Sequence, residues 1–80
     1  MALDPDDPRT PSQQIASILR AEIKTGKFAP GEKLPSQHDL VERFSVARET
    51  IKAALRKLQE ERLIVTRQGS GTFVRANTER

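Results

Sequence analysis

The chain has 80 residues, of which 35% are hydrophobic and 31% charged, and it contains no Cys, Trp or Tyr. A chain this short forms one small domain that buries roughly 60% of its unfolded surface, which excludes a deep enclosed substrate cavity. Disulfides and thiolate metal sites are excluded as well, and no apolar stretch approaches the roughly 20 residues that span a bilayer. The acidic, proline-broken N-terminus is unlike a signal peptide, so we expect a cytoplasmic protein whose function lies on its surface.

The charge is unevenly distributed along the chain. Residues 1–10 hold three Asp and one Arg, a net charge of −2, whereas residues 11–80 hold 13 basic and 8 acidic residues, a net charge of +5. Because residues 1–10 lack hydrophobic periodicity, they are predicted to form a flexible acidic tail. The basic remainder favours a polyanion such as nucleic acid, although simple solubility would explain the same balance.

The first predicted element is an amphipathic helix that begins at Pro11 and is ended by Gly26. Thr10 is the expected N-cap, and Gln13 can close a capping box, with Ser12 as the competing cap. Apolar residues at i, i+3, i+4 and i+8 share one face of this helix: Ile15, Ile18, Leu19 and Ile23.

A turn-rich connection follows over residues 27–35, because this segment has two prolines and a Pro-Gly pair. Leu34 is predicted to form a very short strand. Ser36 then caps a second helix, and Asp39, three residues on, either reaches back to the cap or complements the helix dipole. The inner face of this helix is supplied by Leu40, Val41 and Phe44.

After a break near Ser45-Val46, a third helix runs to about Glu60. Its inner face is predicted to consist of Ile51, Ala54, Leu55 and Leu58, and its outer face to carry Arg48, Glu49, Lys52 and Arg56. Two strand-like runs, residues 63–66 and 72–74, flank a glycine-containing turn and are typical of a hairpin. The three aromatic residues are spaced like core residues: Phe28, Phe44 and Phe73.

The order helix, helix, helix, hairpin predicts an α+β, mainly α, fold: a winged helix-turn-helix of three helices plus a β-hairpin wing. We expect this domain over residues 11–76, with the helix-turn-helix at about 37–56 and the wing at about 67–72. Residues 77–80 would be a linker or tail. By pattern alone, a small three-helix bundle with tight turns is the alternative.

Several ordered motifs narrow this prediction: Pro-Gly-Glu-Lys-Leu-Pro-Ser at 30–36, Val-Ala-Arg-Glu-Thr-Ile-Lys at 46–52, and Gly-Ser-Gly-Thr-Phe-Val at 69–74. Together they resemble the DNA-binding domain of GntR-family bacterial transcription regulators over residues 11–75, and the last motif is most similar to the HutC branch. The resemblance implies a winged helix-turn-helix that binds double-stranded operator DNA as a homodimer, without a cofactor.

Such regulators usually carry a C-terminal domain that binds a small-molecule effector, and 80 residues cannot hold it. We therefore expect either an excised DNA-binding head or a short family member, and favour the head. A repressor is expected, because occluding a promoter requires only binding; activation stays open.

The resemblance and the chemistry of the side chains together predict the DNA-binding residues: Lys33, Ser36, His38, Arg48, Glu49, Thr50, Lys52, Arg56, Arg67, Gln68, Gly69, Ser70 and Gly71. Arg48 matches a base-reading position and can pair bidentately with guanine. Thr50 can contact a phosphate or a thymine methyl group. Glu49 can accept from cytosine N4, or else pair with Lys52 in solvent.

The remaining predicted residues position the domain on phosphates. Lys33, Ser36, Lys52 and Arg56 are expected phosphate contacts. In the wing, the glycines permit close backbone approach to DNA, although a bare hairpin turn also needs them. His38 stands where many relatives have Arg, so its protonation is expected to strengthen binding in mild acid unless it is an ordinary surface histidine.

Three further departures from the family pattern concern turns and caps. Ser45 stands where relatives commonly have Gly, and a positive φ there would cost on the order of 1 kcal/mol. Ala47 lacks the side-chain acceptor of the usual Ser cap, at a similar cost. Arg62 replaces the Gly usual after the third helix, which weakens the expected stop signal.

Enzymatic function is not predicted, because the chain has one His, no Cys, no nucleotide-binding glycine loop and no clustered metal ligands. The rival function is a winged-helix protein-interaction module without sequence-specific DNA binding. Arg48 distinguishes the two, because its loss should relax a base preference only if DNA is read.

Overall fold

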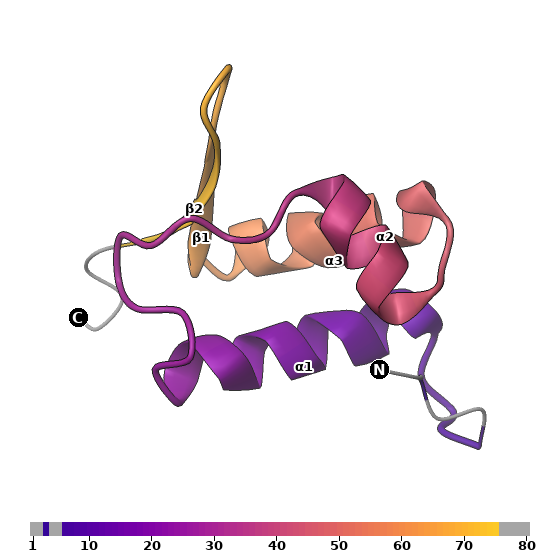
Figure 1. The fold of residues 1–80 in the computed structure, drawn as a ribbon. Coiled ribbons are helices and arrows are strands. Elements are labelled where there is room, and N and C mark those ends of the chain that lie inside the picture. Colours follow the sequence, from indigo (N-terminus) through magenta and orange to yellow (C-terminus); the bar gives the residue numbers. More distant parts are fainter. Residues whose placement is uncertain (1–2, 4–5, 76–80) are drawn as a thin grey trace.

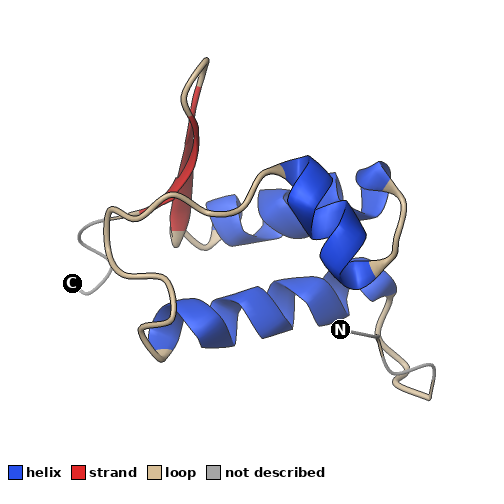
Figure 2. Cartoon of the chain, in the orientation of Figure 1, coloured by secondary structure: helices blue, strands red, loops and turns tan. Residues whose placement is uncertain are grey.

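In a computed structural model, which describes residue 3 and residues 6–75, three helices carry a two-stranded antiparallel hairpin (Figures 1 and 2). The elements are α1 Pro11–Lys24, α2 Gln37–Phe44, α3 Arg48–Glu60, β1 Ile64–Arg67 and β2 Gly71–Val74. This confirms the predicted winged helix-turn-helix. The predicted linker 77–80 lies outside the described residues. Among those described, no helix is long and apolar enough to cross a membrane.

The ends of α1 follow from local sequence. Thr10 Oγ1 accepts from the Gln13 amide at 3.3 Å, and Gln13 Oε1 accepts from the Thr10 amide at 3.1 Å, so the predicted capping box is confirmed with Thr10 as the cap. The helix stops just before Gly26, whose φ of 89° reverses the chain. The Gly26 amide donates to Ile23 O and the Lys27 amide to Glu22 O, the pair of bonds that defines a Schellman motif.

The hydrophobic core lies where α1, α2 and α3 meet the base of the hairpin. Its buried apolar members are Ile15, Ala16, Leu19, Leu34, Leu40, Phe44, Ile51, Ala54, Leu55, Leu58, Ile64 and Val74. Phe44 is in this core as predicted, and Phe28 packs half-buried against its edge. The core prediction is wrong for Phe73, because strand residues alternate between faces and the inward position goes to Val74.

The hairpin projects from the helices and is held at its base by the connection between α1 and α2 (Figure 1). The predicted strand contact in that connection lies one residue earlier than expected, as an isolated bridge between Lys33 and Phe73. Beside it, the Leu34 amide donates to Thr72 O at 2.8 Å and the Val74 amide to Glu32 O at 2.9 Å. This segment therefore covers the free edge of β2.

The strands are shifted slightly from the predicted runs. β1 starts at Ile64 rather than at residue 63 and continues to Arg67, which pairs with Gly71. The turn is consequently residues 68–70, and the rung nearest it is Arg67 with Gly71. The rung before it pairs Thr66 with Thr72.

Part of the segment predicted as an acidic tail contacts the domain. Leu3 packs against the core, and the Gln14 side chain donates to Arg9 O at 3.1 Å. Arg9 also pairs with Asp7 at 2.7 Å. Flexibility of residues 1–10 stays a prediction, and positions 1, 2, 4 and 5 lie outside the described residues.

Candidate nucleic-acid interface

The start of α2 is held by Ser36, as predicted. Ser36 has extended backbone angles, φ −68° and ψ 165°, and its Oγ accepts from the Asp39 amide at 3.1 Å. His38, in the first turn, lies 3.2 Å from Glu42 through Nε2 and Oε2, and both side chains are 69% exposed. The predicted phosphate-binding end of α2 is thus open to solvent.

The turn between α2 and α3 contains the two departures expected there. Ser45 adopts the left-handed conformation at φ 57° and ψ 48°, which residues other than Gly, Asn and Asp rarely occupy. Ala47 is the N-cap of α3 at φ −68° and ψ 154°, with no side-chain cap hydrogen bond. The turn thus adopts a left-handed residue and an N-cap conformation without the residue types that favour them.

α3 presents an exposed basic flank. At about 100° per residue, positions separated by four lie nearly in line, so Arg48, Lys52 and Arg56 share one side of the helix, and all three are exposed. Thr50 is half-buried and lies on the opposite flank, away from Arg48. Glu49 pairs with Lys52 at 3.5 Å, which is the alternative role predicted for Glu49 from the sequence.

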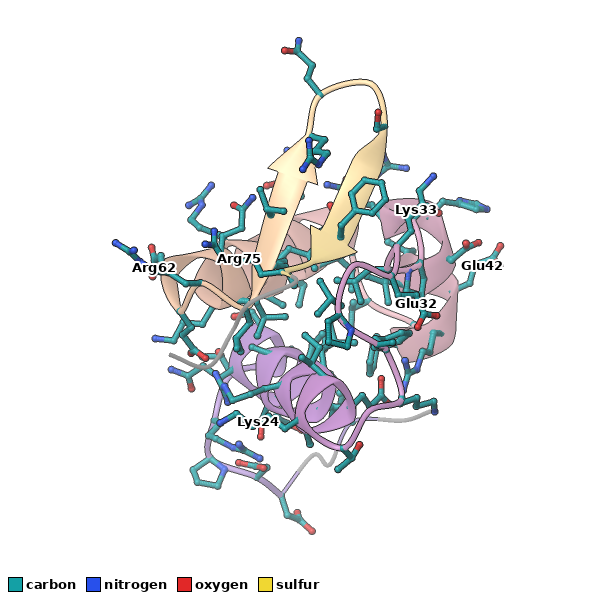
Figure 3. All side chains as sticks on the ribbon, turned by 90° about the vertical axis from the view of Figure 1, so that its left-hand side faces the viewer. Lys24, Glu32, Lys33, Glu42, Arg62 and Arg75 are labelled. Carbon is teal, nitrogen blue, oxygen red and sulfur yellow. The ribbon has the colours of Figure 1, made fainter. Side chains whose placement is uncertain are left out.

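The wing places its predicted contacts around a tight turn. Gly69 has φ 81° and no atom would contact a Cβ there, whereas Gly71 has φ 117° and a Cβ would come 2.6 Å from Lys33 Cε. The Lys33 side chain therefore lies directly across Gly71. Figure 3 shows Lys33 beside β2, on the side of the hairpin that faces α2.

A groove joins these parts. It runs between the start of α2, α3 and the wing, and is lined by Lys33, Leu34, Pro35, Ser36, Gln37, Leu55, Thr66, Gly69, Ser70, Gly71 and Thr72. Five of the predicted DNA-binding residues therefore line one surface. Gln37, Thr66 and Thr72 were not predicted; the threonines face the groove because of the hairpin register, which the sequence alone does not fix.

The ion pairs between different helical segments lie on the α1 side. There, Arg43 donates to Glu22 from both terminal guanidinium nitrogens, with Nη1 at 3.0 Å from Oε1. Arg20 binds Glu61 at 2.6 Å. These hydrogen bonds lower the pKa of both carboxyls below the usual Glu range. They also tie α1 to α2 and α3.

On the side of α2, α3 and the wing, the two ion pairs among the described residues are each local to one helix, His38 with Glu42 and Lys52 with Glu49. Within the described part of the chain, no acidic side chain lies within 4 Å of Lys33, Arg48, Arg56 or Arg67. No group of three or more described His, Asp or Glu residues is placed to hold a metal ion. The surface formed by α2, α3 and the wing is thus an open, positively charged groove with hydrogen-bonding side chains.

Comparison with known proteins agrees with this geometry. Residues 11–74 match the model of the family described as bacterial regulatory proteins, gntR family. The chain belongs to this family. The DNA-binding domain of AraR, solved in complex with operator ORX1, superposes with a TM-score of 0.83 at 30% identity, covering 92% of this chain and 94% of that one.

Curated GntR relatives include the mannosyl-D-glycerate transport/metabolism system repressor MngR of Escherichia coli, which is 41% identical over 63 residues. The histidine utilization repressor of Klebsiella aerogenes is 39% identical over 62 residues, in line with the predicted HutC-like branch. These alignments cover 79% and 78% of this chain but only 26% of each relative. The chain thus spans about a quarter of their length.

Proposed function

We propose that this GntR domain binds double-stranded operator DNA sequence-specifically, as the DNA-reading head of a transcription regulator. The proposal is supported by four exposed cations that have no acidic partner among the described residues: Lys33, which lines the groove, Arg48 and Arg56 on α3, and Arg67 in β1. Glu22 and Glu61 are paired with arginines on the α1 side, whereas Glu42 and Glu49 pair with His38 and Lys52 on α2 and α3. Duplex DNA supplies the closely spaced negative charges that such a surface lacks.

Within this proposal, phosphate contacts set the position and base contacts set the sequence. Arg48, at the exposed start of α3, reads a guanine, and Glu49 exchanges Lys52 for a cytosine amine. Thr50, on the opposite flank, contacts the DNA only at the edge of the interface. The remaining predicted residues serve as phosphate or wing contacts: Lys33, Ser36, His38, Lys52, Arg56, Arg67, Gln68, Gly69, Ser70 and Gly71.

The mode of regulation extends the same proposal. Repression is the favoured outcome, because a domain that only binds DNA can still occlude a promoter. Two such heads would occupy a palindromic operator, and an effector-binding domain of the kind found in longer relatives would set their spacing. The site of action would be the cytoplasm, where bacterial DNA lies.

The test replaces Arg48 by Ala. Because Arg48 is exposed and none of the described acidic residues pairs with it, the fold and its melting temperature should stay unchanged. Operator affinity should fall by about 1–3 kcal/mol, and one base preference should relax. Lys24→Ala is the matched control: it removes an exposed cation from α1, far from the wing (Figure 3). Equal losses in both variants would indicate a merely basic surface and reject sequence reading.

A further inference from the structure

The wing is connected to α3 by side chains that none of the predicted DNA contacts includes. Gln59, in the last turn of α3, donates from Nε2 to Thr66 Oγ1 at 2.6 Å. Thr66 lies directly across the hairpin from Thr72, and their hydroxyl oxygens are 3.5 Å apart. The short bond from Gln59 therefore joins α3 to β1, and Thr72 on β2 is a more distant polar neighbour of the Thr66 hydroxyl.

This link lies two rungs beyond the buried base of the hairpin, on the same face. Strand residues alternate between faces, so the threonines continue the inner face begun by the buried pair Ile64 and Val74. Beyond them, the backbone bonds of residues 67–71 stay within the hairpin. The angle between the wing tip and α3 is therefore set at this rung.

The opposite strand edge is held differently. There, the connection between α1 and α2 bonds to β2: the Leu34 amide donates to Thr72 O, and the Val74 amide donates to Glu32 O. These bonds fix the base of the wing and reach no further toward its tip than Thr72. Neither bond involves α3. The Gln59 link is thus the only side-chain hydrogen bond between the described residues of α3 and the hairpin.

We propose that Gln59 is a positioning residue that fixes the wing relative to α3, so that both elements meet one DNA duplex together. The inference rests on the proposed function, because the benefit of a fixed angle is realised when α3 and the wing bind at once. A loosely held wing must be ordered on binding, and that ordering reduces affinity. Gln59 need not touch DNA itself.

The first experiment needs no DNA. In Gln59→Met, which keeps helix propensity, and in Thr66→Val, which keeps the strand, residual dipolar couplings should show that the amides of residues 67–71 are less ordered relative to α3. Thr66→Ser, which retains the hydroxyl, should preserve them. Glu60→Met, at the next exposed position of α3, is the control. Unchanged couplings in both disrupting variants would overturn the inference, whatever the domain binds.

The second experiment measures affinity for a selected operator duplex. Gln59→Met and Thr66→Val should each lose roughly two- to tenfold, the range of one net hydrogen bond, and the double variant should lose no more than either. In an Arg67→Ala/Gln68→Ala background, Gln59→Met should have no further effect. Additive losses would mean that Gln59 contacts DNA directly. If wild type itself fails to prefer the operator, the proposed function fails, while the couplings still decide whether Gln59 holds the wing.

Discussion

Replacing Ala47 by Ser should stabilise the domain, because the backbone at this N-cap is already in the capping conformation. Ala47 has φ −68° and ψ 154°, close to Ser36 at −68° and 165° and Thr10 at −67° and 159°. Those two caps accept from the third helical amide at 3.1 and 3.3 Å. A Ser at position 47 would present its Oγ to the amide of Thr50 in the same way.

The expected gain is about 1 kcal/mol, within the range of about 0.5–2 kcal/mol measured for such caps. The upper end of this range is not expected, because the Thr50 amide already donates to Ala47 O at 3.0 Å, so the added Oγ would not rescue an unbonded amide. In a domain of this size, 1 kcal/mol raises the melting temperature by roughly 4–8 °C. Urea unfolding without DNA should show a higher midpoint and an unchanged m value.

The control is the same substitution elsewhere on the same helix. Ala53 is exposed in the interior of α3, where Ser has lower helix propensity than Ala, so Ala53→Ser should destabilise the domain by about half a kcal/mol. The two variants therefore move in opposite directions. If Ala47→Ser is no more stable than wild type, the assigned backbone geometry of this cap is wrong.

Three further predictions follow from the backbone and the ion pairs. Arg62 follows α3 at φ 64°, and the amides of Arg62 and Leu63 make the same pair of bonds as those of Gly26 and Lys27 after α1. Arg62→Gly should therefore stabilise the domain by about 1 kcal/mol in urea unfolding. Destabilisation would refute the left-handed conformation of this residue. Gly71→Ala and Gly69→Ala should both strain the turn, but only Gly71→Ala displaces the Lys33 side chain. Only Gly71→Ala should therefore reduce the slope of DNA affinity against salt concentration. Equal salt slopes in the two variants would contradict this. Hydrogen bonding to Arg43 depresses the folded-state pKa of Glu22. The stabilisation from this ion pair is therefore complete above the unfolded-state pKa and is lost as pH falls through the folded-state pKa. The difference in unfolding free energy between wild type and Glu22→Gln should be full at pH 7 and should close in acid, and a pH-independent difference would count against the ion pair.

The helices were predictable because their signals are local. Thr10 and Ser36 cap helices through bonds to residues three positions away, and the apolar spacing of α3 fixes its inner face. The family pattern added the unusual backbone of Ser45, which local propensity would not favour.

The features that the sequence did not predict depend on contacts between distant segments. Glu22 meets Arg43 only once α1 and α2 have packed. Phe73 lies on the outer face of the hairpin and Thr66 on the groove face because of the hairpin register, in which Ile64 pairs with Val74 at the buried base. The Gln59 link follows from that register, so hydrophobic pattern alone could not reveal it.

The central claim is that the groove between α2, α3 and the wing reads a DNA sequence. Its most direct test selects bound duplexes from a random pool, then measures affinity against salt concentration for the winner and for a scrambled duplex. We expect an enriched palindrome that is bound far more tightly than the scrambled control, with a slope of log affinity against log salt concentration near −0.9 per phosphate contacted. Equal, weak binding of both duplexes would contradict it and favour a protein partner for the same surface.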